Sequence, residues 1–242
     1  EYEALILEDA GDERVVSLPT NREEIDEFFT IYKEYKEKCC DQAWVDKPEN
    51  SISVETEGQF SKWREISKKM YKEHPYRQEG DEELIDQSVE ILKEGYKGAE
   101  WEFQHRHLSD GDLYKKDDQI IVLSNLYWSH RPVNYDAVFA YHWYMYHLSD
   151  LDNITQQEIE KQRQLWMKGI EETISPESKE EKRLLNLALL ERATAGLVLD
   201  ALSLDIEKEH AQYLVERTRD EVKRLCKILS KKRTLSGYIW SK

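Results

Sequence analysis

The fold is decided by residues 179–232, KEEKRLLNLALLERATAGLVLDALSLDIEKEHAQYLVERTRDEVKRLCKILSKK, which carry the most continuous apolar surface of the chain. The spacing predicts two consecutive helices with a break near Leu202. In the first helix, apolar residues occur on every side of the helical wheel, and such a helix is normally buried. Ser178-x-x-Glu181 is a capping box, a pattern that starts a helix. We therefore expect a central, buried helix here.

The second helix of this block has a seam of small and apolar residues at alternating steps of four and three, as in helices that pack nearly parallel. The seam consists of Ala211, Val215, Thr218, Val222, Leu225 and Leu229. Glu207 lies four residues before Ala211 on the same face, and His210 lies beside it. Two interpretations stay open for this pair. Both side chains are exposed at a frayed first turn of the helix, or they form one half of a metal site.

Shorter amphipathic helices are predicted upstream. Capping boxes begin at Thr20, Thr56 and Thr155, and each precedes a run with one apolar face. Residues 133–148, VNYDAVFAYHWYMYHL, are apolar and aromatic nearly all round, which predicts a buried central helix or part of a subunit contact. Within this run, His142 and His147 do not share one helical face, so we expect hydrogen-bonded core histidines rather than metal ligands.

The middle of the chain is harder to interpret. Gly80-Asp81 starts a predicted helix whose apolar stripe runs to about Leu108, with Gly95 and Gly98 marking the close approach of a neighbouring backbone. Residues 109–116 are predicted to be a polar connection. Residues 119–128 suit either a strand or a short buried helix, and the helical context favours the helix.

These patterns together predict a mainly α protein, a bundle of about seven or eight helices with a small N-terminal β-hairpin. Residues 1–19 are expected to form the hairpin as an appendage, and residues 20–232 to form the helical domain. Residues 233–242 are expected to form a docking tail, because Tyr238-Ile239-Trp240 is an apolar end.

Composition excludes several classes of protein. The chain has 35 Lys and Arg and 50 Asp and Glu, which gives a net charge of -15. Because this charge repels the phosphates of nucleic acids, we do not expect broad electrostatic binding of DNA or RNA. No run approaches the roughly 18 apolar residues of a membrane span, and no signal sequence is recognisable. The 3 cysteines are an odd number, with two adjacent, which is not a disulfide framework and predicts a reducing cytoplasm.

The most specific candidate for chemistry is a pair of Glu-x-x-His motifs, Glu102 with His105 and Glu207 with His210. On a helix this spacing points both side chains to one side, and a dinuclear metal site uses one such motif from each of two helices. In this respect only, the chain resembles ferritin-like di-iron proteins, which implies two iron or manganese ions and oxidoreductase activity. Glu is so common here that such motifs also arise by chance.

Positive charge gathers in and after the last helix. The cations are Arg217, Arg219, Lys223, Arg224, Lys227, Lys231, Lys232 and Arg233. We expect them to complement the helix dipole and to pair with acids such as Glu216, Asp220 and Glu221. The alternative is an acidic or nucleic-acid partner at this helix.

Three functional hypotheses follow. The first is a non-catalytic helical interaction or scaffold subunit of a larger assembly, without catalytic residues or cofactor. It would bind a protein partner or a second copy of the chain through the aromatic helix or the C-terminal tail. The second is the di-iron or di-manganese oxidoreductase, and the third is a nucleic-acid-associated subunit that uses the basic last helix. No nucleophile elbow and no glycine-rich phosphate loop supports another enzyme class.

Overall fold

The computed structural model describes residues 13–14, 19–40, 54–69, 74–116, 119–123, 128–148, 151, 154–203 and 210–230. These residues form seven α-helices and five short strands, which confirms the predicted mainly α class. The helices are α1 (Arg22–Cys39), α2 (Val54–Lys69), α3 (Asp81–Gly95), α4 (Tyr135–His147), α5 (Gln156–Ile174), α6 (Lys179–Val198) and α7 (Ala211–Ser230). The strands are β1 (Glu13–Arg14), β2 (Trp101–Gln104), β3 (Leu113–Lys116), β4 (Gln119–Val122) and β5 (Ser129–Pro132). Two short 3-10 helices are η2 (Asp110–Asp112) and η4 (Asp200–Ser203).

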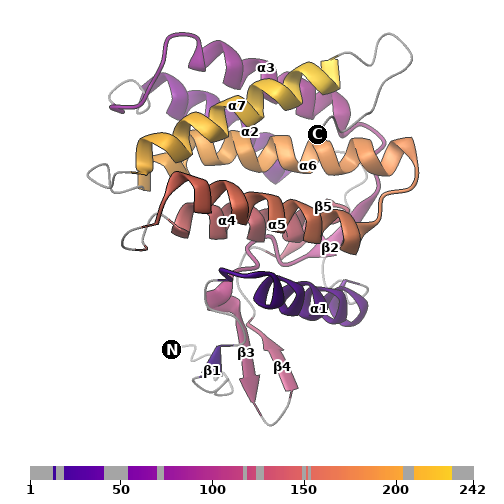
Figure 1. Cartoon of the computed structure of the whole chain (residues 1–242). Coiled ribbons are helices and arrows are strands. Elements are labelled where there is room, and N and C mark those ends of the chain that lie inside the picture. Colours follow the sequence, from indigo (N-terminus) through magenta and orange to yellow (C-terminus); the bar gives the residue numbers. More distant parts are fainter. Residues whose placement is uncertain are drawn as a thin grey trace, which may run out of the picture.

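Helix α6 is the centre of the molecule, as its sequence predicts. It contacts α2, α3, α4 and α7 (Figure 1), and every residue from Leu184 to Val198 is buried. The predicted capping box forms in full, because Ser178 accepts from the amide of Glu181 while the Glu181 carboxylate accepts from the amide of Ser178. The leucine-rich stretch therefore sets the positions of its neighbours.

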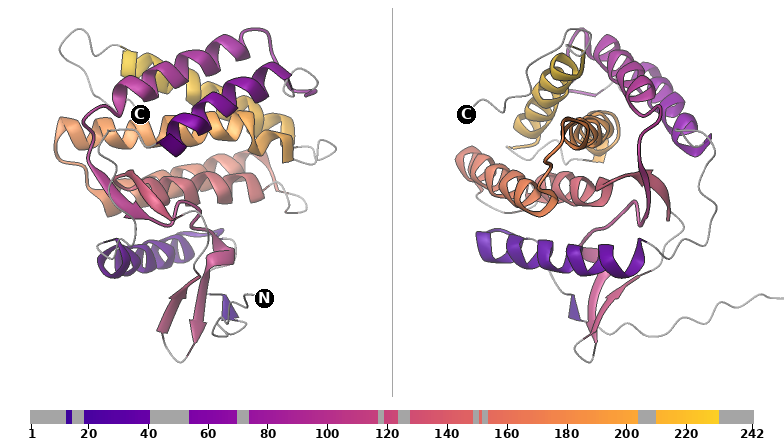
Figure 2. Two further views of the ribbon diagram at one scale, coloured as in Figure 1. Left: turned by 180° about the vertical axis from the view of Figure 1, so that it is seen from behind. Right: turned by 90° about the vertical axis from the view of Figure 1, so that its right-hand side faces the viewer.

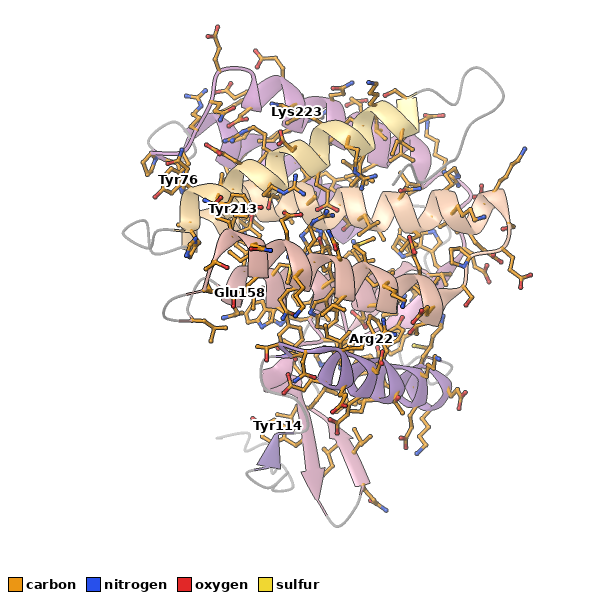
Figure 3. The ribbon with its side chains drawn as sticks, viewed as in Figure 1. Arg22, Tyr76, Tyr114, Glu158, Tyr213 and Lys223 are labelled. Carbon is orange, nitrogen blue, oxygen red and sulfur yellow. The ribbon has the colours of Figure 1, made fainter. Side chains whose placement is uncertain are left out.

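The other helices lie on two sides of α6. Helices α2, α3 and α7 form one side, α4 and α5 form the other, and α1 is an outer layer that packs on α5 (Figures 1 and 2). Arg22 of α1, labelled in Figure 3, forms an ion pair with Glu172 of α5. The predicted seam of α7 is confirmed, since it is buried from Ala211 to Leu225 and Leu229 is half-buried against the core.

Helix α4 is the buried central helix that its aromatic sequence predicts. From Tyr135 to Tyr146 only Trp143 is half-buried, and the other side chains are buried. His142 is a core histidine that is 3% exposed, but its Nε2 atom has no hydrogen-bond partner among the described residues, in contrast to the expectation.

The predicted long helix that begins at Gly80-Asp81 is wrong in its second half. Helix α3 ends at Gly95, Gly98 adopts a left-handed backbone with φ of 70°, and residues 101–104 form β2. Tyr96, Ala99 and Phe103 are nevertheless buried as the apolar stripe requires. Gly95 marks a close approach, since a Cβ there would lie 2.5 Å from Leu187 Cδ2, whereas Gly98 serves the turn.

The helix favoured for residues 119–128 is wrong at residues 119–122, and the connection predicted for residues 109–116 is wrong at residues 113–116. Residues 113–116 and 119–122 form an antiparallel pair, with Leu113 opposite Val122 and Lys116 opposite Gln119. The β-branched side chains of Ile120, Ile121 and Val122 favour a strand, and β3 supplies the partner that sequence periodicity could not reveal.

The predicted N-terminal hairpin lies largely, and the predicted C-terminal docking tail wholly, outside the described residues. Of the predicted hairpin, Glu13 and Arg14 form β1, which pairs with Lys115 and Tyr114 of β3 in the sheet order β1-β3-β4. Residues 233–242 are not described. None of the described helices has the length and apolar character needed to cross a bilayer.

Candidate functional site

The candidate site is the turn that follows β2, held between the two-stranded sheet and the start of α4. Strand β2 pairs antiparallel with β5, so that Glu102 lies opposite Arg131 and Gln104 opposite Ser129. Two residues after the end of the strand, Arg106 adopts a left-handed backbone with φ of 68°. A non-glycine residue in this region is strained, and such strain persists only where the surrounding structure enforces it.

A buried carboxylate enforces the turn. Asp136 of α4 is 0% exposed, and its Oδ2 atom accepts from the Tyr35 hydroxyl at 2.8 Å and from the His105 amide at 2.9 Å. Burial raises the pKa of Asp136, while the His105 ring, the Tyr35 hydroxyl and the backbone amides of His105 and Arg106 act in the opposite direction. The carboxylate therefore holds consecutive amides at the strained position.

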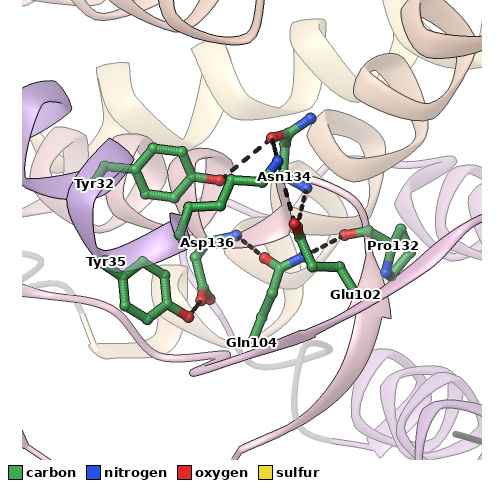
Figure 4. A network of polar contacts seen from close by, with 8 residues as sticks. Tyr32, Tyr35, Glu102, Gln104, Pro132, Asn134 and Asp136 are labelled. Atoms are coloured by element: carbon green, nitrogen blue, oxygen red, sulfur yellow. Dashed lines mark hydrogen bonds and ion pairs between the residues drawn. The ribbon is translucent and has the colours of Figure 1, made fainter. Parts of the chain in front are cut away.

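Further polar contacts, made by Gln104, Glu102 and Asn134, fix the start of α4 to β2 (Figure 4). The amide of Asp136 donates to Gln104 Oε1 at 2.9 Å, and Gln104 Nε2 donates to the Pro132 carbonyl at 2.9 Å and to Glu102 Oε2 at 3.0 Å. Asn134 joins this group, because its backbone N–H donates to Glu102 Oε2 at 3.4 Å. Strand β2, strand β5 and helix α4 are thus connected through side chains as well as backbone.

Helix α1 completes the network from the opposite side. Lys36 Nζ lies 3.3 Å from Glu102 Oε1 and donates to Asn134 Oδ1 at 2.8 Å. The Tyr32 hydroxyl approaches the same Asn134 oxygen at 3.4 Å. Tyr32, Lys36 and Asn134 therefore tie α1 to the base of the turn.

The turn itself carries a histidine–aspartate group. Asp112 accepts from the amide and the hydroxyl of Ser109, at 2.9 and 2.7 Å, and so closes the short helix η2. Its carboxylate oxygens lie 3.9 Å from His105 Nε2 and 4.0 Å from His107 Nδ1. Partial burial acts to raise the pKa of Asp112, but His107, Ser109 and the nearby His105 ring outweigh this effect, so the pKa is lowered.

His107 projects onto one side of α4. Its ring centroid lies 4.6 Å from that of Phe139 and 5.2 Å from that of Trp143. Trp143 stacks on Phe139 with an interplanar angle of 17° and contacts His147 at 4.5 Å. We call His107, Phe139, Trp143 and His147 the aromatic face. His107 is 39% exposed, and Trp143 and His147 are half-buried, so the face reaches the surface.

The predicted metal residues do not assemble as the sequence suggests. Glu102 lies on β2 and His105 directly after it, where side chains three apart point to opposite sides. Glu102 contacts Lys36, whereas His105, which is buried, donates from Nε2 to the Leu123 carbonyl at 2.8 Å. His210 is half-buried next to α7, and Glu207 lies outside the described residues.

The metal hypothesis therefore stays a prediction. Its first motif, Glu102 with His105, does not lie on a helix, so the spacing that motivated it does not apply there. Within the part of the chain that the structure describes, no group of three or more His, Cys, Asp or Glu is arranged to hold a metal ion.

Three basic residues of α7 contact acids of the protein, whereas Lys223 and Lys227 are exposed. Arg219 binds buried Asp81 of α3, Arg217 binds Glu160 of α5, and Arg224 lies 3.9 Å from Glu221. Asp81 and Glu160 come from other helices, whereas Glu221 is one of the acids predicted to pair within α7. The nucleic-acid hypothesis stays a prediction, and Lys231, Lys232 and Arg233 lie outside the described residues.

Sequence reasoning did not identify Asp136, Tyr35, Asp112 or His107 as a group. One signal was available, because Asp136 is a carboxylate near the start of an otherwise aromatic helix. A buried carboxylate needs hydrogen-bond donors, so its presence indicated a polar site in the core. The donors, however, come from α1 and from the turn after β2, and no local pattern connects these segments.

Comparison with known proteins gives one distant structural likeness. No protein-family model matches the chain, and no curated protein shows significant similarity to it. Among solved structures, one described as a glucosamine kinase (crystal form B) aligns with a TM-score of 0.44 and 11% sequence identity, over 86% of this chain and 52% of that chain. The chain therefore spans about half the length of that protein, and a likeness at this level carries no argument about fold or function.

Proposed function

We propose that this chain is a non-catalytic interaction subunit that recognises a protein partner through the aromatic face. The observation that carries the proposal is the buried network around Asp136, which fixes the turn at Arg106 and places the His107 ring against Phe139 and Trp143. Rigid aromatic side chains at a surface dominate binding energy at many interfaces, because they bury a large area and lose little conformational entropy.

The way in which charged groups are used supports a structural rather than a catalytic role. Arg131 and Glu191, both 0% exposed, form an ion pair, and Glu191 Oε2 also accepts a hydrogen bond from the Tyr96 hydroxyl at 2.7 Å. Asp112 binds Ser109 at hydrogen-bond distance, whereas His107 lies 4.0 Å away. A general acid or base must reach a substrate proton, and these groups are directed at partners within the fold.

The chemistry of the aromatic face suggests which partner it fits. Imidazole and indole rings combine apolar area with hydrogen-bonding nitrogen atoms, and they suit a protein segment with apolar anchors and a few polar groups. We propose a reducing cytoplasm as the compartment, which the free thiols of Cys39, Cys40 and Cys226 support.

The test compares proteins captured from extracts of the source cells by three immobilised forms of the full chain. These are the wild type, a face variant with His107→Ser and Trp143→Ser, and a control with Gln157→Ser and Lys161→Ser at exposed positions of α5. We expect one protein, or a second copy of the chain, at near-equimolar ratio with wild type and control. The face variant should retain about tenfold less, the loss typical of removing a central interface anchor.

Folding must be separated from recognition in this test. His107→Ser alone serves this purpose, because the side chain is 39% exposed and its removal leaves the core of α4 intact. Thermal unfolding of this variant should match the wild type, while capture falls. Equal capture by all three forms, or loss of capture only together with loss of folding, would contradict the proposal.

A further inference from the structure

A small hollow of about 30 Å³ lies between α4, α5 and α7. It is found near Tyr213 (Figure 3), whose hydroxyl donates to Glu160 of its lining at 2.9 Å. The residues that α4 contributes to the lining are all buried, whereas the charged residues from α5 and α7 are half-buried. The hollow, which we call the α4–α7 hollow, therefore leads from partly exposed charged groups to the buried side of α4.

One polar side chain of the lining is not satisfied by the fold. His142 is 3% exposed, and its Nε2 atom has no hydrogen-bond partner among the residues that the structure describes. Such a buried nitrogen is costly to leave unpaired, and nearly all buried polar groups in folded proteins bind either another protein group or ordered water. We therefore looked for the partner of His142 in the hollow that it lines.

The neighbouring polar groups are already bonded to one another. Glu160 of α5 accepts from Arg217 Nε of α7 at 2.6 Å. The Tyr146 hydroxyl of α4 donates to Thr218 Oγ1 of α7 at 3.0 Å. These bonds fix the walls of the hollow, so a partner for His142 Nε2 has to be a molecule that enters it.

The charges around the hollow favour a neutral occupant. The charged side chains of the lining are two carboxylates and two guanidinium groups, those of Glu160, Glu221, Arg163 and Arg217. Their formal charges balance, and His142 is itself neutral because burial lowers its pKa well below 6.5. An ion would lose its hydration here without a net opposite charge to replace it.

Size and hydrogen bonding then identify the occupant. A site needs roughly 10 to 15 Å³ of accessible space to hold one water molecule, which the hollow exceeds. The Nε2 atom of a neutral imidazole either donates or accepts, according to its tautomer, and water can do both.

We propose that an ordered water molecule binds in the α4–α7 hollow, hydrogen-bonded to His142 Nε2 and to a polar side chain of α7. This water connects α4 to α7 at a place where the two helices do not satisfy each other directly. The inference does not depend on the aromatic face.

The test is a crystal structure of the full chain at a resolution that shows ordered water. We expect a water oxygen about 2.7 to 3.2 Å from His142 Nε2 and within the same range of a polar atom of α7. In His142→Phe, which keeps an aromatic ring without ring nitrogens, this water should be lost. The control His147→Phe changes a histidine of the same helix that is not among the lining residues, and it should keep the water.

Several outcomes would overturn the proposal. In the wild type these are no water at that distance from Nε2, an ion or a buffer molecule in its place, or a rotated ring whose Nε2 binds a protein group. A water that stays in His142→Phe, or one that is lost equally in the control, would exclude the role of His142. The wild-type structure decides the first three outcomes even where a variant does not fold.

Discussion

Two buried carboxylates, Asp81 and Asp136, each hold part of this molecule together, and they do so by different means. Asp81 at the start of α3 is paired with a full positive charge, because Arg219 of α7 contacts its two oxygens at 2.7 and 3.1 Å. Asp136 at the start of α4 instead accepts from neutral donors, the Tyr35 hydroxyl and the His105 amide. The first connects two helices, and the second shapes a turn.

The difference indicates how each site should respond to change. A buried ion pair leaves an uncompensated charge when one partner is removed, so its loss should affect the whole fold. A carboxylate held by neutral donors loses individual hydrogen bonds, so its loss should be smaller and local. The pKa of Asp136 is raised by burial, which reflects the absence of a bound cation at hydrogen-bond distance among the described residues.

The largest expected effect is that of Arg219→Met. The substitution keeps apolar volume but leaves Asp81 buried without its cation, and breaking such a pair costs about 3 to 5 kcal/mol. Urea unfolding at pH 7 measures the loss. The double variant with Asp81→Leu should recover most of it, because no buried charge remains. A single variant as stable as the wild type would show that this pair does not hold α3 to α7.

A smaller loss is expected for Asp136→Asn. The asparagine amide keeps one acceptor oxygen but serves two donors less well than a carboxylate does. Because it also avoids burying a charge, we expect the free energy of unfolding to fall by only about 1 to 2 kcal/mol. The same urea experiment measures it, with Asp220→Asn at an exposed position of α7 as the control. A loss as large as that of Arg219→Met would remove the distinction between the two carboxylates.

The third prediction concerns His142, a buried histidine to which the described residues bring no carboxylate at ion-pair distance. Burial, with a contribution from Arg192, lowers the pKa of His142 well below 6.5. Below about pH 6.5 His142 takes up a proton in the unfolded chain but not in the folded one. The free energy of unfolding therefore decreases as the pH falls from about 6.5 towards the lower pKa of the folded state. The slope is at most about 1.4 kcal/mol per pH unit.

Unfolding curves between pH 7.5 and 5 measure this slope in wild type and His142→Gln. The variant should have a shallower decline than the wild type, because it lacks the buried imidazole. Identical slopes for wild type and His142→Gln would mean that this ring is not kept neutral by burial.

The helical half of the molecule could be predicted because its signals are local. The capping boxes at Thr155 and Ser178 form as expected, and the buried sides of α6 and α7 follow from apolar spacing alone. Helix α1 differs by one residue, since Asn21 rather than Thr20 accepts from a first-turn amide. Local hydrogen bonding and amphipathic periodicity are sufficient for such elements.

The region between α3 and α4 could not be predicted because its structure depends on distant partners. Apolar spacing continued through Tyr96, Ala99 and Phe103 and so mimicked a longer α3, although Gly95 and Gly98 offered a helix end. The strands of this region are four residues long, and β2 pairs with β5, which follows β3 and β4 in the chain. The site depends further on Tyr35 of α1, which no pattern links to Asp136.

The central claim is that Asp136 holds the turn that carries His107, independently of the helical core. Amide hydrogen exchange at His105, in wild type and in Asp136→Ala, tests it most directly. We predict slow exchange in the wild type, because this amide donates to the buried carboxylate, and much faster exchange in the variant, while the amides of Leu187 to Leu197 in α6 keep their protection. Fast exchange at His105 in the wild type, or an equal change in both regions, would contradict it.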